Sequence, residues 1–319
     1  MFDALLRPAL LSASRSSRVE RTVTALSSTR KLVDRFVAGE SEPHAAAATR
    51  SLLDSGRLVT IDHLGEDTTD LIRARTNVDH YLELLRTLRE MRESTGIVRP
   101  LEVSLKLSAL GQSLPGDGHA AALEHAHLIC SAAATAGVWV TVDAEDHTTT
   151  DSTLAIVREL RADFPWLGTV LQAYLRRTES DCREFSGVGS RIRLCKGAYR
   201  EPASVAFQAR AEVDRSYLRC LDILMHGQGY PMVATHDPAL IEAAGHSARA
   251  AERRAGEFEF QMLYGIRDEE QRRLVTDGQQ LRVYVPYGDQ WYGYFMRRLA
   301  ERPANLAFFL RSLRPANRR

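Results

Sequence analysis

The chain has 319 residues, of which 44% are hydrophobic and 26% are charged, which is an ordinary globular composition. Its formal net charge is +1, so it lacks the basic excess by which many proteins attract a phosphate backbone. A chain of this length can form about two domains, but α/β barrels routinely fill such a length as one. Composition and charge therefore argue against nucleic acid as the main partner.

The cysteines and the N-terminus bear on the compartment. The four cysteines lie far apart and show no CxxC spacing, so we expect neither a disulfide framework nor a zinc site, and a reducing compartment fits. No apolar run approaches the ~18 residues that are needed to cross a bilayer. Asp3, Arg7 and Pro8 interrupt the first apolar stretch, which argues against a secretory signal. The Arg- and Ser-rich start also has the composition of an organelle transit peptide, and the alternative is a helix packed on the domain.

The first 57 residues differ from the rest of the chain. Residues 1–57 are rich in Ala, Arg and Ser, with apolar residues at helical spacing and turn signals at 39–43 and at Gly56. From Leu58 onward, short β-branched apolar runs alternate with longer amphipathic segments. We therefore predict a helical lead-in at residues 1–57 and a separate α/β domain at residues 58–319.

The pattern after Leu58 predicts eight strands. They are expected at residues 58–63, 101–107, 138–143, 169–174, 191–195, 231–236, 257–263 and 281–285. Between them, three segments hold apolar side chains at helical spacing. The expected buried faces are Val78, Tyr81, Leu82, Leu85, Leu88 and Met91, then Leu123, His127, Cys130 and Ala134, then Val213, Tyr217, Leu221 and Leu224. Eight strands that alternate with helices predict a parallel sheet, and eight is the number that closes a (βα)8 TIM-like barrel.

Polar side chains collect at the predicted C-terminal ends of the strands, where barrel enzymes place their active sites. These strand-end residues include Asp62, His63, Glu66, Lys106, Asp143, Glu145, Gln172, Tyr174, Arg193, Lys196, Thr235, His236, Asp237, Gln261 and Tyr284. Five cations belong to this end of the barrel or to the last helix, and their convergence implies anionic ligands. They are Lys106, Arg193, Lys196, Arg297 and Arg298. A small carboxylate together with a phosphorylated cofactor would account for all five.

Two local patterns suit those anions. On the helix that follows the last strand, Tyr294 precedes Arg297 by three residues and Arg298 by four, so the three side chains share one face. Each guanidinium offers a planar fork for a carboxylate, although an amphipathic helix with arginine on its solvent face is the alternative. Lys196-Gly197-Ala198 can cradle a phosphate because glycine lets the backbone approach closely, although the same residues can form a simple turn. The chain contains no GxGxxG or Walker A motif.

A metal site is the competing interpretation of the strand ends. His63, Asp143, His236 and Asp237 could be ligands of a metal-dependent barrel hydrolase. Two observations argue against it. The first strand ends in DHLGE rather than the HxH of many such enzymes, and five nearby cations would repel a divalent ion.

Seven motifs, in order along the chain, resemble those of the flavin-dependent proline dehydrogenases. They are LKLSAL (105–110), DAED (143–146), VLQAY (170–174), RLCKGAY (193–199), ATHD (234–237), FQMLYG (260–265) and YGYFMRRLAER (292–302). The resemblance covers about residues 58–310, and the short chain resembles the bacterial monofunctional branch, without the aldehyde dehydrogenase module of the bifunctional enzymes. It implies a distorted (βα)8 barrel with a final helix over the strand ends, so that residues 58–319 form the catalytic domain.

The resemblance also implies roles for individual residues. Asp143 and Arg193 match catalytic residues, with Arg193 near the flavin N5. Substrate-binding positions are Lys106, Leu263, Tyr284, Tyr294, Arg297 and Arg298. FAD-binding positions are Ala144, Gln172, Arg193, Lys196, Gly197, Ala198, Thr235, His236 and Glu301. Glu66 matches an acid that pairs with Arg297 to close the pocket as a gate. One departure is Arg200, where bifunctional members carry Trp, and it fits the monofunctional branch.

The sequence thus predicts FAD-dependent oxidation of L-proline to Δ1-pyrroline-5-carboxylate, with electrons passed to a membrane quinone as the resemblance implies. The expected location is the bacterial cytoplasm, with peripheral contact at the inner face of the membrane. Candidate contacts are the apolar N-terminal turn and the basic residues Arg311, Arg314, Arg318 and Arg319, although these could equally be a packed helix and a solvated end. The alternatives are a metal-dependent barrel hydrolase or aldolase and a non-catalytic amino-acid-binding barrel.

Overall fold

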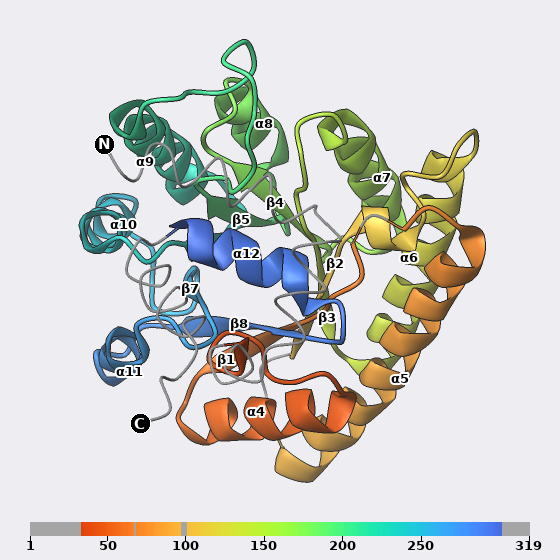
Figure 1. The fold of residues 1–319 in the computed structure, drawn as a ribbon. Coiled ribbons are helices and arrows are strands. Elements are labelled where there is room, and N and C mark those ends of the chain that lie inside the picture. The colour runs from red at the N-terminus through yellow and green to blue at the C-terminus, as the bar shows by residue number, and fades with distance from the viewer. Residues whose placement is uncertain (1–32, 67, 97–100, 302–319) are drawn as a thin grey trace, which may run out of the picture.

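The computed structural model describes residues 33–66, 68–96 and 101–301, and its centre is a closed parallel barrel with strand order β1 to β8 (Figure 1). The strands are β1 Leu58–His63, β2 Glu102–Leu105, β3 Trp139–Val142, β4 Gly168–Gln172, β5 Arg191–Cys195, β6 Tyr230–Ala234, β7 Glu259–Leu263 and β8 Leu281–Tyr287. Each strand pairs with its neighbour in the chain, and β8 closes the barrel on β1 through Leu58 opposite Arg282 to His63 opposite Tyr287. The predicted fold class and all eight strands are confirmed.

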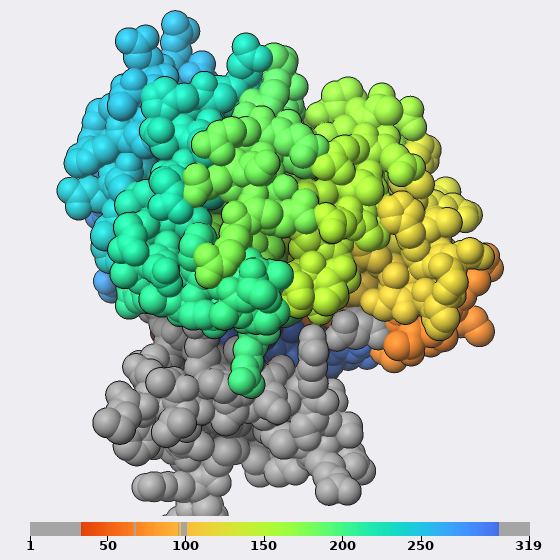
Figure 2. Space-filling model, turned by 90° about the horizontal axis from the view of Figure 1, so that it is seen from above, coloured from red at the N-terminus to blue at the C-terminus, as the bar shows by residue number. Residues whose placement is uncertain are grey.

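The helices form a ring around the strands. They are α4 Glu42–Asp54, α5 Leu71–Thr95, α6 Gly118–Ala136, α7 Thr150–Asp163, α8 Thr178–Phe185, α9 Arg210–His226, α10 Pro238–Ala250, α11 Asp268–Thr276 and α12 Trp291–Glu301. Figure 2 shows the outer face on which α6, α7, α8 and α9 follow one another, from yellow to blue-green. Two helices depart from a regular barrel: α12 lies across the end of the barrel, and α4 packs on β8 and β1 between α11 and α5 (Figure 1).

The alternation along the strands separates an apolar outer layer from a polar barrel interior. On β2, Val103 and Leu105 belong to the apolar core between strands and helices, whereas Glu102 and Ser104 bond to side chains of non-adjacent strands. The same alternation recurs on β5, where Ile192 joins the apolar core. Charged groups therefore fill the barrel, and the apolar core lies outside it.

The predicted helix faces agree with the structure except on α6. Five of the six residues expected on the α5 face are buried, and Leu82 is partly buried against the same core. On α6, Cys130 is buried and Leu123 packs against the core, but His127 and Ala134 are exposed, so the prediction was wrong for half of that face. The buried face is Ala122, Ala126, Ile129, Cys130 and Ala133. The stripe of alanines was missed because His127 was counted as part of an apolar face.

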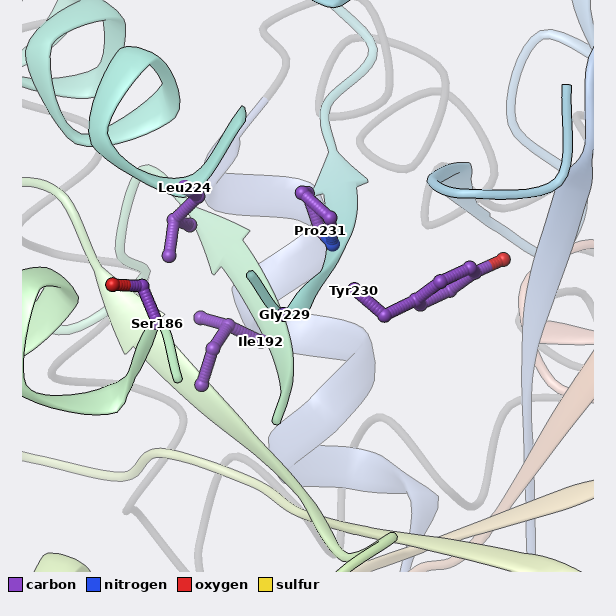
Figure 3. A pocket seen from close by; sticks show the side chains of 6 residues that line it. All are labelled: Ser186, Ile192, Leu224, Gly229, Tyr230 and Pro231. Atoms are coloured by element: carbon purple, nitrogen blue, oxygen red, sulfur yellow. The ribbon is translucent and has the colours of Figure 1, made fainter. Parts of the chain in front are cut away.

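A small pocket at the N-terminal ends of β5 and β6 is remote from the predicted site. It is lined by Ser186, Ile192, Leu224, Gly229, Tyr230 and Pro231 (Figure 3). None of these side chains is charged, and the Tyr230 ring points away from the others toward Glu259 and Gln280. The chemistry of the molecule lies at the opposite end of the strands.

Candidate active site

The β1 and β2 ends bring Lys106 against a buried carboxylate. Lys106 directly follows β2, and its Nζ lies 2.5 Å from Asp62 Oδ2 on β1 and 3.0 Å from the Tyr284 hydroxyl on β8. Burial raises the pKa of Asp62 to about 6, in spite of the Lys106 charge beside it. Burial opposes the charge on Lys106, but Asp62 and Asp143 outweigh it and raise the pKa of that ammonium well above its usual value. Lys106 is therefore a fixed cation in this arrangement.

Asp143, just beyond β3, lies at the centre of the strand ends. Its Oδ1 accepts hydrogen bonds from Ser104 Oγ at 2.6 Å and Arg193 Nη1 at 2.5 Å, and its Oδ2 accepts one from the Tyr284 hydroxyl at 2.7 Å. Burial alone would raise the pKa of Asp143, yet Lys106 and Arg193 lower it below its usual value. Asp143 is an ionised anchor that joins β2, β5 and β8.

Arg193 connects this level to a second group of charges deeper in the barrel. Its Nε donates to Gln261 Oε1 at 2.5 Å, and its Nη2 donates to Glu102 Oε1 at 3.0 Å. We call the deeper group the floor cluster, and it consists of Glu102, Arg191, Glu259 and Arg282. Both carboxylates are fully buried and each pairs with an arginine. The floor cluster supports Arg193 from below.

The first loop and the last helix meet above Lys106. Arg297 Nη2 donates to Glu66 Oε1, and both side chains are largely buried. Burial would raise the pKa of Glu66, but Arg297 and Lys106 lower it, and Glu66 in turn raises the pKa of Arg297. These contacts join six side chains that we call the rim cluster. They are Asp62, Glu66, Lys106, Asp143, Tyr284 and Arg297. The structure places the predicted gate pair in contact.

Helix α12 presents its remaining predicted residues beside the rim cluster. Tyr294 is buried, and the Arg298 guanidinium lies 5.1 Å from the centre of its ring. Leu263 and Tyr284 pack against the apolar group that includes Tyr294 and Phe295. Tyr199, from the loop after β5, lies under Arg297 with 5.7 Å between the guanidinium and the ring centre. Aromatic rings thus surround the two arginines of the last helix.

The predicted cofactor positions gather on the loops after β3, β4, β5 and β6. Gln172 Nε2 donates to the Glu145 carbonyl at 2.8 Å, which joins the β4 end to the loop that holds Ala144. Gly197 has a φ of +113°, and a Cβ there would lie 2.4 Å from the Tyr174 ring, so only glycine fits. His236 Nε2 accepts from the Leu263 amide at 2.9 Å, which leaves the proton of the neutral imidazole on Nδ1.

Two cofactor positions need comment. Lys196 Nζ lies 2.5 Å from Asp214 and 2.9 Å from Asp237, so two carboxylates neutralise the proposed phosphate-binding cation within the protein. Ala198 lies on the same loop as Lys196, and Thr235 Oγ1 accepts from the Asp237 amide at 3.1 Å. Helix α12 ends at Glu301, whose side chain lies outside the described part of the structure, as do the basic C-terminal residues.

Several site residues received no role from the sequence. Glu102, Ser104 and Lys106 are spaced two residues apart along β2 and just beyond it. Because alternate side chains of a strand face the same side, this spacing was a signal that all three point into the barrel. Glu145 is buried and accepts from both the amide and the hydroxyl of Ser108, with 3.0 Å from the amide. Burial and the neighbouring Glu66 raise the pKa of Glu145 to about 7. Its carboxyl needs tertiary contacts to be recognised.

The residues considered as metal ligands have other partners. Asp143 pairs with Arg193, His236 accepts from Leu263, and the His63 ring stacks on His80 with 4.5 Å between ring centres. Within residues 33–66, 68–96 and 101–301, no three His, Cys, Asp or Glu side chains group as metal ligands. In the rim cluster, each of the three carboxylates, Asp62, Glu66 and Asp143, pairs with a lysine or an arginine.

The chain is similar to proline dehydrogenases along nearly its whole length. The family model described as "Proline dehydrogenase" matches residues 45–311. The chain is 37% identical over 309 residues to "Proline dehydrogenase 1" of Bacillus subtilis (strain 168), covering 97% of this chain and 99% of that protein. It is 38% identical over 315 residues to "Proline dehydrogenase" of Deinococcus radiodurans, covering 98% and 99% of the two chains.

The fold of the chain is also similar to that of a solved structure. The crystal structure of proline utilization A (PutA) from Bdellovibrio bacteriovorus, inactivated by N-propargylglycine, superimposes with a TM-score of 0.81 at 25% identity. The match covers 86% of this chain and 33% of that longer protein. Two curated proteins named proline dehydrogenase match this chain over nearly their whole length. These matches rule out the metal-dependent hydrolase and the non-catalytic binding barrel. The chain belongs to the flavin-dependent proline dehydrogenase family and catalyses proline oxidation, the first step of proline catabolism.

Proposed function

We propose that the rim cluster and the two arginines of α12 bind L-proline, and that FAD occupies the loops after β3 to β6. The observation that carries the proposal is Lys106 fixed between Asp62 and Asp143 beneath the Glu66–Arg297 pair. A largely buried cluster of both charge signs beneath such a pair suits a small zwitterion. We further propose that the product is Δ1-pyrroline-5-carboxylate.

The substrate carboxylate would lie between Arg297 and Arg298. A guanidinium carries five N–H donors, so Arg297 can hold Glu66 through one nitrogen and still donate to a carboxylate through the others. Lys106 adds a third positive charge, and its position is fixed by Asp62 and the Tyr284 hydroxyl. Tyr284, Tyr294 and Leu263 would line the pyrrolidine ring, because all three belong to or pack against the same apolar group.

The loops after β3 to β6 have the donors that FAD requires. Gln172, Lys196 and His236 carry N–H donors, and Gly197 takes the positive φ that this loop requires, with the Tyr174 ring packed where a side chain would project. The proposed set of FAD-binding residues also includes Ala144, Ala198, Thr235 and Glu301. When bound, FAD supplies the two-electron oxidant for the C–N bond of proline.

The protein's part of the chemistry is orientation and charge. Asp143 and Glu102 hold the Arg193 guanidinium on both sides, so its positive charge is fixed where it can stabilise a reduced, anionic cofactor. Asp143 also orients the Tyr284 hydroxyl, which lies 3.0 Å from Lys106 Nζ. Closure of Glu66 on Arg297 would exclude water while the substrate nitrogen loses its proton.

We also propose that a membrane quinone takes the electrons and that the enzyme works in the bacterial cytoplasm, in peripheral contact with the inner face of the membrane. The curated relatives are bacterial proteins. In the part of the chain that the structure describes, no helix combines the length and the apolar character of a membrane span. The contact would therefore be peripheral.

One experiment tests the proposal as a whole. The purified protein should show flavin absorption bands, release FAD on denaturation, and lose its oxidised flavin band when L-proline is added without oxygen. A quinone added afterwards should restore the band. A protein that holds FAD but is not bleached by proline would refute the substrate assignment, and one that releases FMN alone would refute the cofactor.

A further inference from the structure

A buried carboxylate outside the rim cluster joins three of the loops that carry the proposed cofactor positions. Glu201 lies on the β5–α9 loop, and 3% of its side chain is exposed. Its Oε1 accepts from the His147 amide at 3.0 Å and from the Tyr174 hydroxyl at 3.1 Å, and its Oε2 pairs with His147 Nδ1. His147 belongs to the β3–α7 loop and Tyr174 to the β4–α8 loop. One side chain therefore receives donors from two other loops.

The backbone of Glu201 is held as well. Gln208 Nε2 donates to the Glu201 carbonyl at 3.3 Å and to the Ala206 carbonyl at 3.0 Å. The same stretch pairs with the β4–α8 loop through Phe207 N to the Tyr174 carbonyl at 2.8 Å. The β5–α9 loop has no helix or strand of its own between residues 196 and 209, so these bonds define its path.

Tyr174 transmits this arrangement to the proposed cofactor cradle. Its ring lies against Gly197, where an added Cβ would meet ring carbons at 2.4 Å, and its amide donates to the Lys196 carbonyl at 2.9 Å. Burial and the adjacent Glu201 carboxylate raise the pKa of Tyr174, so its hydroxyl keeps its proton and remains a donor. The position of Glu201 thus fixes the ring on which the Lys196–Gly197 backbone rests.

We propose that Glu201 is a positioning residue that fixes the shape of the cofactor cradle by tying the loops after β3, β4 and β5 together through His147 and Tyr174. It touches none of the rim-cluster side chains through its carboxylate, so its effect is on retention of the cofactor rather than on recognition of proline. The inference rests on the proposed function, because it takes FAD as the occupant of these loops.

The first readout is the affinity of the apoprotein for FAD, measured by titration of flavin fluorescence. Glu201→Ala removes three hydrogen bonds to a buried carboxylate and should raise the FAD dissociation constant roughly 10- to 100-fold. Glu201→Gln keeps an acceptor for the Tyr174 hydroxyl and should raise it less than Glu201→Ala. At saturating FAD, the KM for proline should stay within about two-fold of wild type in both variants, because the substrate contacts are untouched.

A double-mutant cycle with Tyr174→Phe tests whether Glu201 acts on the cofactor cradle through Tyr174. Tyr174→Phe alone should weaken FAD binding roughly three- to ten-fold, and it should have no further effect in the Glu201→Ala background, because the same hydrogen bond is already lost. Full additivity of the two changes would overturn the role of Tyr174 as the link between Glu201 and the cradle.

The second readout needs no cofactor. In the apoprotein, Glu201→Ala should speed hydrogen exchange at residues 145–149 and 196–207 while leaving the β-strands at wild-type rates. The control is Asp181→Asn, because Asp181 on α8 is also buried, and its partner Arg177 pairs with Asp151 and Asp181 rather than with Glu201. This control should change neither FAD affinity nor exchange in the loops.

Three results would overturn the inference. They are a dissociation constant for FAD within two-fold of wild type in Glu201→Ala, unchanged loop exchange in that variant, or equal losses in the Asp181→Asn control. If the wild-type protein binds no FAD, the proposed function fails and the cofactor half of this inference fails with it. The exchange measurement then still decides whether Glu201 ties the loops together.

Discussion

The floor cluster and the rim cluster use the same kinds of charged groups in the same barrel, but they are built on different elements. Every member of the floor cluster lies on a strand: Glu102 on β2, Arg191 on β5, Glu259 on β7 and Arg282 on β8. The rim cluster also uses strand ends, but its cover is the pair between Glu66 on the β1–α5 loop and Arg297 on α12.

This difference separates a structural charge network from a functional one. Pairing of β7 with β8 holds Glu259 beside Arg282, and closure of the barrel brings Glu102 on β2 to Arg191 on β5, so those charges stay paired whenever the barrel is closed. Glu66 lies on a loop and Arg297 on the final helix, so in the function we propose we expect the rim pair to open and admit a ligand without breaking the barrel. Similar ion pairs therefore hold the fold at one level and, in the function we propose, cover the substrate at the next.

The largest effect should follow from breaking the floor. Glu259→Ala leaves the Arg282 guanidinium, 1% exposed, without the carboxylate that binds it at 2.7 Å. An uncompensated buried charge costs about 3–5 kcal/mol, which urea unfolding should show as a lower free energy of unfolding. The control is Glu179→Ala, which breaks an exposed pair with Arg219 and should cost about 1 kcal/mol or less. Equal losses would remove the distinction between floor and surface pairs.

Glu145 sharpens the comparison, because this rim-level carboxyl is held by Ser108 rather than by an arginine. Its folded-state pKa is raised to about 7 from 4.5, so the folded protein binds more protons than the unfolded chain between these values. The stability that this adds is present at low pH and is lost as pH rises toward 7. Glu145→Gln should therefore stabilise the protein at pH 8 by up to about 3 kcal/mol, with little gain at pH 4. Equal gains at both pH values would contradict the shift.

Tyr284 tests whether the rim shapes the pocket. Its ring lies near Lys106 and Arg193, and its hydroxyl bonds to Asp143. Tyr284→Ser should lose proline activity and change the ratio of kcat/KM for hydroxyproline to that for proline roughly ten-fold in favour of hydroxyproline, because a smaller residue leaves room for a hydroxyl. A ratio that stays at the wild-type value would place Tyr284 away from the ring.

The smallest effect should come from the cover of the rim. Glu66→Ala should leave FAD bound but weaken proline binding by about 1 kcal/mol, roughly five-fold, and slow flavin reduction, because Arg297 loses the carboxylate that orients it but keeps its donors for the substrate. Anaerobic stopped-flow bleaching at several proline concentrations measures both quantities. A variant with wild-type rate and affinity would exclude a gate, and one that loses FAD would make Glu66 structural.

The strands and the site order were predictable from the sequence for physical reasons. Alternation of apolar and polar residues marks each strand, and parallel strands bring their C-terminal ends to one face, so Lys106, Asp143 and Arg193 could be placed together in advance. The positions of Arg297 and Glu66 followed from the resemblance, because a helix that crosses the barrel instead of joining the ring has no signature in its own periodicity.

What the sequence did not predict depends on long-range contacts. The floor cluster was missed because Glu102, Arg191 and Glu259 read as polar residues at strand starts, and only closure of the barrel brings them together. Glu201 was missed because it follows a turn in a loop without periodicity. The buried face of α6 was misplaced because alanine carries little hydrophobic contrast.

The most direct test of the account compares the same substitution at the two levels. Arg298→Lys and Arg191→Lys both keep the charge but remove the planar fork. The apparent dissociation constant for L-proline, from anaerobic flavin reduction, should rise roughly 10- to 100-fold in Arg298→Lys and stay within about two-fold of wild type in Arg191→Lys. An unchanged dissociation constant in Arg298→Lys, or equal increases in both variants, would contradict the assignment of proline binding to the α12 arginines beside the rim cluster.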